Sequence, residues 1–129
     1  MSELKIKTVE DSKTEVSHLL FSKHMNSAGR LFGGQLLMWI DENDVIVIIG
    51  YVTHVGRSSM EIRIDTYVER PDGSRHPVNR AFFVMVALDA NNKPVEVPRL
   101  KIQTIDEQAK WDAAEKRIEL RKQRRDEGF

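Results

Sequence analysis

The chain has 129 residues, with 20 basic and 20 acidic side chains and no cysteine. This length predicts one domain, since it suffices for one hydrophobic core but not for two. The zero formal net charge gives no field that would attract nucleic acid or an anionic membrane, and the absence of cysteine excludes disulfides and thiol catalysis. The N-terminus lacks the apolar core of a signal peptide, and no apolar run reaches the ~20 residues of a membrane-spanning helix. We therefore expect a soluble cytoplasmic protein with neither a nucleic-acid nor a membrane partner.

The first part of the chain predicts a loose polar arm, a strand and a short apolar helix. Residues 1–15 are polar, residues 15–21 fit a strand, and the pair Gly33-Gly34 opens an apolar helix that carries Asp41. A glycine pair lets the backbone approach a ligand closely, because neither residue has a Cβ. A helix start offers unpaired N–H groups and a partial positive charge, which can hold an oxygen that gains negative charge during a reaction. This segment is our candidate active site.

The second part of the chain is dominated by strand patterns and ends in a charged helix. Residues 45–53 are dense in β-branched side chains, which predicts a buried strand. Residues 60–68 alternate apolar and polar side chains, as a half-buried strand does, and residues 81–88 predict a further strand. Residues 95–98 fit a short edge piece, and residues 106–125 are highly charged and favour a helix. Several antiparallel strands and one apolar helix indicate an α+β domain with a sheet wrapped around that helix.

The C-terminal helix carries one narrow apolar stripe, made by Trp111, Ala114 and Ile118 at helical spacing. This stripe could dock against the rest of the protein. We interpret the charges around it as a solvated helix face rather than as a binding surface.

Three ordered blocks of sequence resemble the motifs of hotdog-fold acyl-CoA thioesterases of the bacterial acyl-CoA hydrolase type, and the match covers most of residues 14–100. In chain order they are Asn26-x-x-Gly29-x-x-Phe32-Gly33-Gly34-x-Leu36-x-x-Trp39-Ile40-Asp41-Glu42, then His54-Val55-Gly56-Arg57-Ser58-Ser59-Met60-Glu61, then Ala81-Phe82-Phe83-Val84-Met85-Val86-Ala87-Leu88-Asp89 followed by Lys93-Pro94-Val95. The resemblance implies a hotdog domain, which we assign to residues 1–105, before a charged helical tail over residues 106–129. It also implies hydrolysis of a fatty acyl-CoA, or a related acyl-CoA, to the free acid and CoA.

The resemblance breaks directly after Glu42. In the family the central helix continues for several turns, and a further strand precedes the Val/Ile-rich one, whereas here residues 45–53 follow almost at once. The nine residues from Gly34 to Glu42 make a helix only ~13 Å long. The absent helix end, strand and connections amount to about thirty residues or more. Either the sequence omits a segment between Glu42 and Val45 or that segment is truly deleted, and we favour omission because the flanking blocks are intact.

Hydrolysis of a thioester requires a polarised carbonyl, a nucleophile and a donor to the tetrahedral oxyanion. The Gly34 or Gln35 N–H at the helix start is the candidate oxyanion donor, and Gly33 allows the substrate to approach. Asp41 is the candidate general base on a water, or the direct nucleophile, and the sequence leaves both roles open. Asn26 would orient the water or the carbonyl.

The spacing of these residues predicts a site shared between two chains. Asp41 lies seven residues after Gly34, close to two helical turns or ~10 Å along the axis. A general base must come within ~3 Å of the proton that it takes, or reach it through one water. Antiparallel pairing of two copies would bring Asp41 of one chain to Gly34 of the other, in a symmetric homodimer with two composite sites. The hotdog resemblance implies the same homodimer, and it allows a hexamer built as a trimer of dimers.

The second block supplies candidate CoA-binding residues. Arg57, Ser58 and Ser59 follow Gly56 on a turn, and by resemblance they would face the CoA phosphates, for which arginine and hydroxyl groups are suitable donors. A solvated turn is the alternative. The four histidines show no metal-ligand spacing, so we predict no metal, and no bound cofactor is expected, because CoA is part of the substrate.

Two other functions remain open at this point. The first is a non-catalytic acyl-CoA-binding or regulatory hotdog module that kept the fold and lost turnover. The second is a hotdog hydratase or dehydratase, a class expected to place a histidine near its acid.

Overall fold

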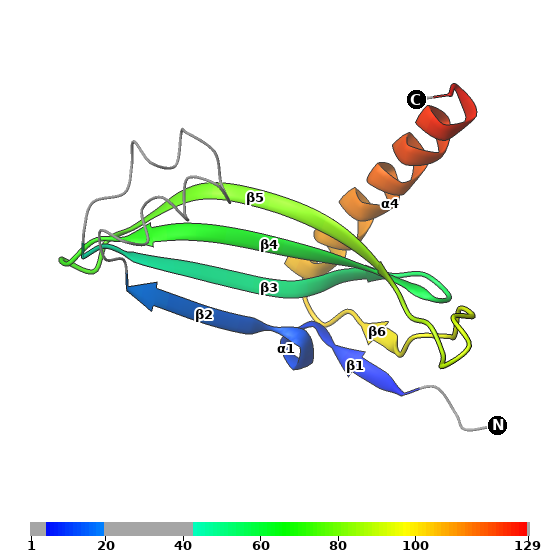
Figure 1. Ribbon diagram of the computed structural model, residues 1–129, viewed down its shortest axis with the longest axis horizontal. Coiled ribbons are helices and arrows are strands. Elements are labelled where there is room, and N and C mark those ends of the chain that lie inside the picture. The colour runs from blue at the N-terminus through cyan, green and yellow to red at the C-terminus, as the bar shows by residue number, and fades with distance from the viewer. Residues whose placement is uncertain (1–4, 20–42, 129) are drawn as a thin grey trace. The chain divides into compact units, whose positions relative to one another are not determined.

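The computed structural model describes residues 5–19 and 43–128 (Figure 1). The predicted glycine-pair helix lies outside the described residues. The described elements are, in chain order, β1 (Ile6–Thr8), α1 (Val9–Ser12), β2 (Thr14–Leu19), β3 (Val45–Val55), β4 (Ser59–Glu69), β5 (Arg75–Val86), β6 (Arg99–Lys101) and α4 (Ile105–Asp126).

A four-stranded sheet in the order β2-β3-β4-β5 forms the main body of the fold. β2 is antiparallel to β3, with Thr14 opposite Gly50 and Leu19 opposite Val45. The links from β3 to β4 and from β4 to β5 are too short for a crossover, so these neighbours are also antiparallel. This sheet confirms the predicted antiparallel arrangement of an α+β hotdog domain.

By their contacts, the residues form two compact units. The first consists of Met1–Lys13, Tyr51–Arg63 and Phe82–Phe129, and the second of Thr14–Gly50 and Ile64–Ala81. The predicted division into residues 1–105 and 106–129 concerns domains rather than these units, and it stays a prediction.

In the second unit, buried carboxylates are matched by arginines. Asp44 is 1% exposed, and its Oδ2 lies 2.7 Å from Nη1 of Arg70. Asp65 accepts a 3.0 Å hydrogen bond from Nε of Arg80. These pairs compensate the desolvation of the two carboxylates, which would otherwise be costly. A tight turn follows β4: the Gly73 N–H donates to the Arg70 carbonyl at 2.8 Å, and Gly73 has a φ of +88°.

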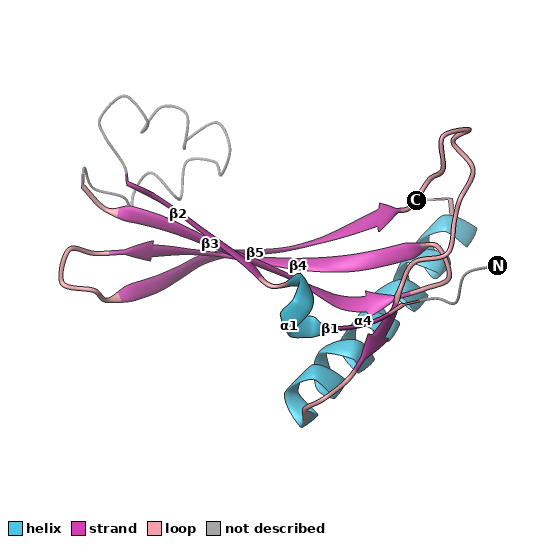
Figure 2. Ribbon diagram, turned by 90° about the horizontal axis from the view of Figure 1, so that it is seen from below, coloured by secondary structure: helices cyan, strands magenta, loops and turns pink. Residues whose placement is uncertain are grey.

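The first unit holds the two described helices, α1 and α4, and the sheet of β1 and β6. β1 pairs with β6 in parallel, with Ile6 opposite Arg99. α1 begins with a capping box, in which Thr8 and Asp11 satisfy each other's backbone N–H groups. α4 is the longest of the described helices (Figure 2), and its Ala114 is fully buried. None of the described helices is long and apolar enough to cross a membrane.

Three expectations about local structure need correction. The arm predicted to be loose contains β1 and α1, because its main chain pairs with β6 far along the sequence. The strand predicted at 81–88 begins earlier, at Arg75, and it contains Pro77. Among the described strands β5 lies at the edge of the sheet, where a proline is tolerated. The edge piece predicted at 95–98 does not form a strand, and the pairing shifts to Arg99–Lys101.

Candidate functional site

Five predicted site residues lie outside the described residues, namely Asn26, Gly33, Gly34, Gln35 and Asp41. Their catalytic and oxyanion roles, and the composite site that they predict, therefore stay predictions. The structure does describe the predicted CoA-binding turn of Arg57, Ser58 and Ser59, together with the elements that hold it.

Main-chain hydrogen bonds fix this turn between β3 and β4. The Gly56 N–H donates to the Ser59 carbonyl at 2.9 Å, which closes the turn. The Ala87 N–H donates to the Ser58 carbonyl at 2.8 Å, and the Val97 N–H donates to the Arg57 carbonyl at 2.9 Å. The segment that follows β5 therefore braces the turn, and it restricts the positions of the turn's side chains.

Arg99 adds a charged brace to the same turn. Its Nη2 donates to the carbonyls of Gly56 at 2.6 Å, Val97 at 2.9 Å and Arg57 at 3.2 Å. Hydrogen bonds from a charged donor are stronger than neutral ones. This role could not be predicted from the sequence, because an isolated arginine beside a short strand has no distinctive pattern.

The side chains of the turn differ in their surroundings. The Arg57 side chain is 86% exposed and pairs only loosely with Glu96, with 3.4 Å between Nε and Oε1. Ser59 is half-buried, and a Cβ placed on Gly56 would lie 2.8 Å from its Oγ. The glycine therefore leaves room for the Ser59 hydroxyl, while the Arg57 guanidinium remains accessible to an anion.

A buried carboxylate follows the turn and anchors α4. Glu61 is 3% exposed and binds Arg117 through two contacts, with Nη2 to Oε1 at 2.7 Å and Nε to Oε2 at 3.0 Å. The Thr53 hydroxyl donates to Oε1 at 2.7 Å, and Nη2 of Arg121 lies 3.6 Å from Oε2. Burial raises the pKa of Glu61, but the hydrogen bonds from Arg117 and Thr53 and the two arginine charges outweigh it, so the net pKa lies below its usual range. A carboxylate held in this way stays ionised as an anchor and is a poor proton acceptor.

His54 makes a second contact between the sheet and α4. It is 7% exposed, its Nε2 lies 3.0 Å from Oε1 of Glu115, and its ring centroid lies 4.0 Å from that of Trp111. The predicted apolar stripe of α4 does dock, since Trp111 contacts His54 and Ala114 is buried. The interpretation of the helix charges as merely solvated is wrong for Glu115 and Arg117. In the part of the chain that is described, no three His, Cys, Asp or Glu side chains form a metal-binding cluster.

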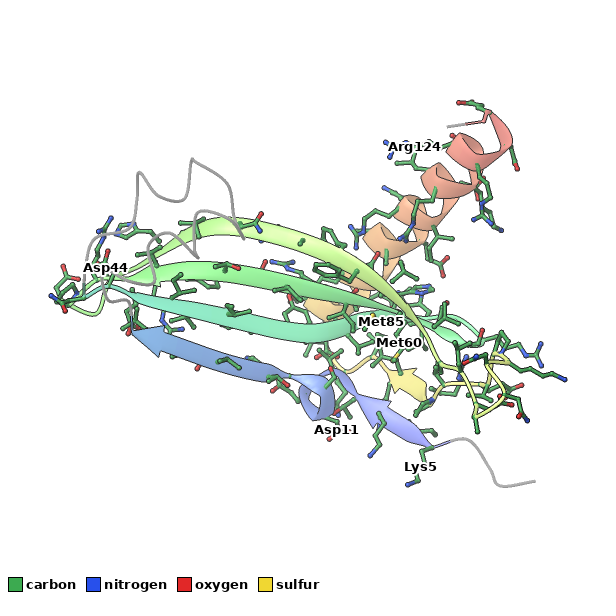
Figure 3. All side chains as sticks on the ribbon, viewed as in Figure 1. Lys5, Asp11, Asp44, Met60, Met85 and Arg124 are labelled. Atoms are coloured by element: carbon green, nitrogen blue, oxygen red, sulfur yellow. The ribbon has the colours of Figure 1, made fainter. Side chains whose placement is uncertain are left out.

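A cavity of about 480 Å³ lies between α4 and the start of β4. Its lining includes Ser59 and Met60 from β4, Val84 from β5 and Ile118, Lys122 and Arg125 from α4. Met60 is labelled in Figure 3. We call this space the α4 cavity. It has the size of a small-molecule site and shares Ser59 with the predicted CoA-binding turn.

Comparison with known proteins identifies similar chains, although no family model matches this one. An uncharacterized acyl-CoA thioester hydrolase of Bacillus subtilis is 29% identical over 147 residues, which cover 90% of this chain and 86% of the relative. A crystal structure of an apo-hexameric acyl-CoA thioesterase is 28% identical, with a TM-score of 0.78 over 94% of this chain and 97% of the other. An acyl-CoA hydrolase from Staphylococcus aureus, solved with butyryl coenzyme A and coenzyme A, is 23% identical, with a TM-score of 0.76 over 95% and 93% of the two chains.

The alignment with the Bacillus subtilis relative also shows how many aligned positions have no residue in this chain. Because 90% of 129 residues is about 116, roughly 31 of the 147 aligned positions have no counterpart here. This number is close to the roughly thirty residues expected for the helix end, strand and connections that are absent after Glu42. Whether the segment is omitted or deleted stays open, because Glu42 lies outside the described residues. The antiparallel sheet and these relatives together show that the chain is similar to hotdog-fold acyl-CoA thioesterases.

Proposed function

We propose that the protein hydrolyses the thioester of a fatty acyl-CoA, or a related acyl-CoA, to the free acid and CoA. The observation that carries this proposal is the relative named an acyl-CoA thioester hydrolase, which aligns with 90% of the chain. The braced turn is the described feature that fits the same substrate, because its Arg57 side chain is exposed and its guanidinium is open to an anion. The reaction takes no bound cofactor, since CoA enters as part of the substrate.

The catalytic roles are proposed from the sequence. The Gly34 or Gln35 N–H would donate to the carbonyl oxygen as it gains charge. Gly33, which has no Cβ, would let the substrate approach the backbone there. Asp41 would take a proton from water, whose oxygen then bonds to the carbonyl carbon, or its own oxygen would attack that carbon to form an anhydride that water hydrolyses. In both routes the C–S bond breaks and the CoA sulfur leaves and is protonated. Asn26 would orient the water or the carbonyl.

The same spacing supports a homodimer whose sites combine Asp41 of one chain with Gly34 of the other. A hexamer, as a trimer of such dimers, is the larger assembly that we propose, and the name of the hexameric neighbour is in keeping with it. The cytoplasmic location expected from the sequence stays a prediction.

A thiol-release assay across acyl-CoA chain lengths tests the activity. We expect turnover in the native protein and a loss of about 10²–10⁴-fold in kcat for Asp41→Asn, the usual contribution of a general base. Glu42→Gln, at the neighbouring acid, is the matched control and should remain active. Binding of acyl-CoA without thiol release would instead favour the non-catalytic module. Hydration of an enoyl-CoA without thiol release would favour the hydratase.

Subunit mixing tests the composite site separately. Asp41→Ala and Asn26→Ala proteins, each inactive alone, should regain some activity as heterodimers, because one of the two sites then has both residues intact. Confirmed heterodimers with no recovered activity would contradict the shared site while leaving the activity of the native protein unaffected.

A further inference from the structure

We propose that Arg99 is a positioning residue for the predicted CoA-binding turn, and that it aims the main-chain N–H groups of Arg57 and Ser58 at a phosphate group of the substrate. The inference rests on the proposed function, and it adds a residue that acts through the turn rather than on the substrate. Arg99 begins β6, about forty positions along the chain from the turn that it contacts.

The first support is the set of acceptors that Arg99 contacts. Its Nη2 lies 2.6 Å from the Gly56 carbonyl oxygen and 3.2 Å from the Arg57 carbonyl oxygen. A guanidinium has donors and no acceptor, so both contacts are donations from Arg99 to the turn. The carbonyl groups of Gly56 and Arg57 therefore point towards Arg99.

The second support is the geometry of a trans peptide bond. The described residues contain no cis peptide bond, and in a trans peptide the C=O of one residue and the N–H of the next point in opposite directions. The N–H groups of Arg57 and Ser58 therefore point away from Arg99. Neither of them donates a hydrogen bond within the described part of the chain. Two successive N–H groups of this kind in a turn make an anion-binding concavity.

The third support is that one of these two peptide groups depends on Arg99 more than the other. The Arg57 carbonyl also accepts a hydrogen bond from the Val97 N–H at 2.9 Å, whereas among the described residues the Gly56 carbonyl has Arg99 as its donor. Gly56 has no Cβ, so its backbone has more conformational freedom than that of other residue types. Without Arg99, the peptide between Gly56 and Arg57 can rotate, and the Arg57 N–H loses its direction.

The N-terminal arm holds Arg99 in place for this role. β1 pairs with β6 (Figure 1), with Ile6 opposite Arg99, and the Arg99 N–H donates to the Lys5 carbonyl at 2.8 Å. The main chain of Arg99 is thus fixed by β1 while its side chain fixes the turn. Arg57 adds an exposed guanidinium to the two N–H groups, and both kinds of donor suit a phosphate oxygen.

The test compares acyl-CoA, which carries phosphate groups, with acyl-pantetheine, which has none. For Arg99→Ala we expect KM for acyl-CoA to rise about tenfold, which corresponds to 1.4 kcal/mol, with little change in kcat or in the kinetics of acyl-pantetheine. A loss of folded protein lowers the rates of both substrates equally, so the ratio of their kcat/KM values isolates the phosphate contacts. Arg99→Lys keeps a charged donor and should restore part of this ratio. The matched control is Lys101→Ala, which removes an exposed cation from the same strand.

A double variant separates the N–H groups from the Arg57 side chain. Arg57→Ala leaves the main-chain N–H groups in place, so Arg99→Ala should lower the ratio further in the Arg57→Ala protein. Three results would overturn the inference even if the native protein is an active thioesterase: an unchanged ratio in Arg99→Ala, an equal fall in Lys101→Ala, or no further fall in the double variant.

If the native protein releases no thiol, calorimetric titration with CoA decides instead. A Kd that rises in Arg99→Ala and stays unchanged in Lys101→Ala supports the positioning role without the activity. An equal Kd in the two variants, or an absence of CoA binding to the native protein, refutes it.

Discussion

The ion pair between Glu61 and Arg117 provides the sharpest test of how α4 is held. Arg117→Ala removes both guanidinium contacts to a carboxylate that is 3% exposed. It also removes the guanidinium that lies 3.7 Å from the centroid of the Phe82 ring. The carboxylate keeps its hydrogen bond from the Thr53 hydroxyl. Nη2 of Arg121 lies 3.6 Å from its Oε2 in the native protein.

These contacts set the expected magnitude. Removing one partner of a fully buried ion pair costs ~3–5 kcal/mol, because a charge is left without compensation. Here Arg121 can move towards the carboxylate, and Arg117 itself is 29% exposed, so the loss should be smaller. The cation–π contact adds ~0.5–1 kcal/mol. We expect Arg117→Ala to lower the free energy of unfolding by about 2–4 kcal/mol.

Urea unfolding followed by far-UV circular dichroism measures this loss, at one protomer concentration so that assembly does not change the comparison. Arg124→Ala, an exposed arginine of the same helix, should stay within ~0.5 kcal/mol of the native protein. Equal losses in the two variants would refute the anchoring role. In a double-mutant cycle, Glu61→Gln should cost less in the Arg117→Ala background than alone, since the two side chains interact directly.

Other consequences of the structure can be measured in the same way. The pKa of Glu61 is lower in the folded chain than its usual value of ~4.3. The contribution of ionised Glu61 to the free energy of unfolding is therefore fully present above that value and is lost as the pH drops through the lower folded pKa. Glu61→Gln should weaken this acid dependence of the urea midpoint. Thr104→Ala removes the side-chain cap that begins α4, and urea unfolding should show a loss of ~0.5–2 kcal/mol. Ala114→Leu inserts a larger side chain at a fully buried position and should cost ~1–3 kcal/mol by the same measurement. Gly56→Ala should displace the Ser59 hydroxyl and raise KM for acyl-CoA in the thiol-release assay, with little change in stability because Ser59 can rotate.

The strands and the tail helix could be predicted because their signals are local. Residues 45–53 and 60–68 lie within β3 and β4, and α4 extends one residue beyond the prediction at each end. The pairing of β1 with β6 could not be predicted, because each strand has three residues and its partner lies about ninety positions away. Short strands carry too little pattern for a periodicity argument.

The candidate site rests on motifs, and its roles stay predictions. The structure does form a turn at Arg57 to Ser59, with the Arg57 side chain exposed. Arg99 and Arg117 were missed for a physical reason: each acts through a partner that is distant in sequence, at Gly56 and Glu61. A charge pattern cannot distinguish a cation that reaches a buried carboxylate from one that is solvated.

The anchor at Glu61 also explains how α4 can serve the turn. Side chains two residues apart in a strand point to the same face, so Ser59 and Glu61 both point from β4 towards the helix that Arg117 joins to it. From Arg117, Arg125 lies two turns further along α4, or ~12 Å, and it lines the same cavity as Ser59. This ion pair, together with the contacts of His54 with Glu115 and Trp111, holds the helix in its register along the cavity. Arg117→Ala should therefore raise KM for acyl-CoA as well as lower stability, because the helix borders the predicted CoA-binding turn at Ser59. Thr104→Ala, which weakens the far end of α4, should lower stability alone. Equal KM values in the two variants would show that the register of α4 does not depend on the ion pair.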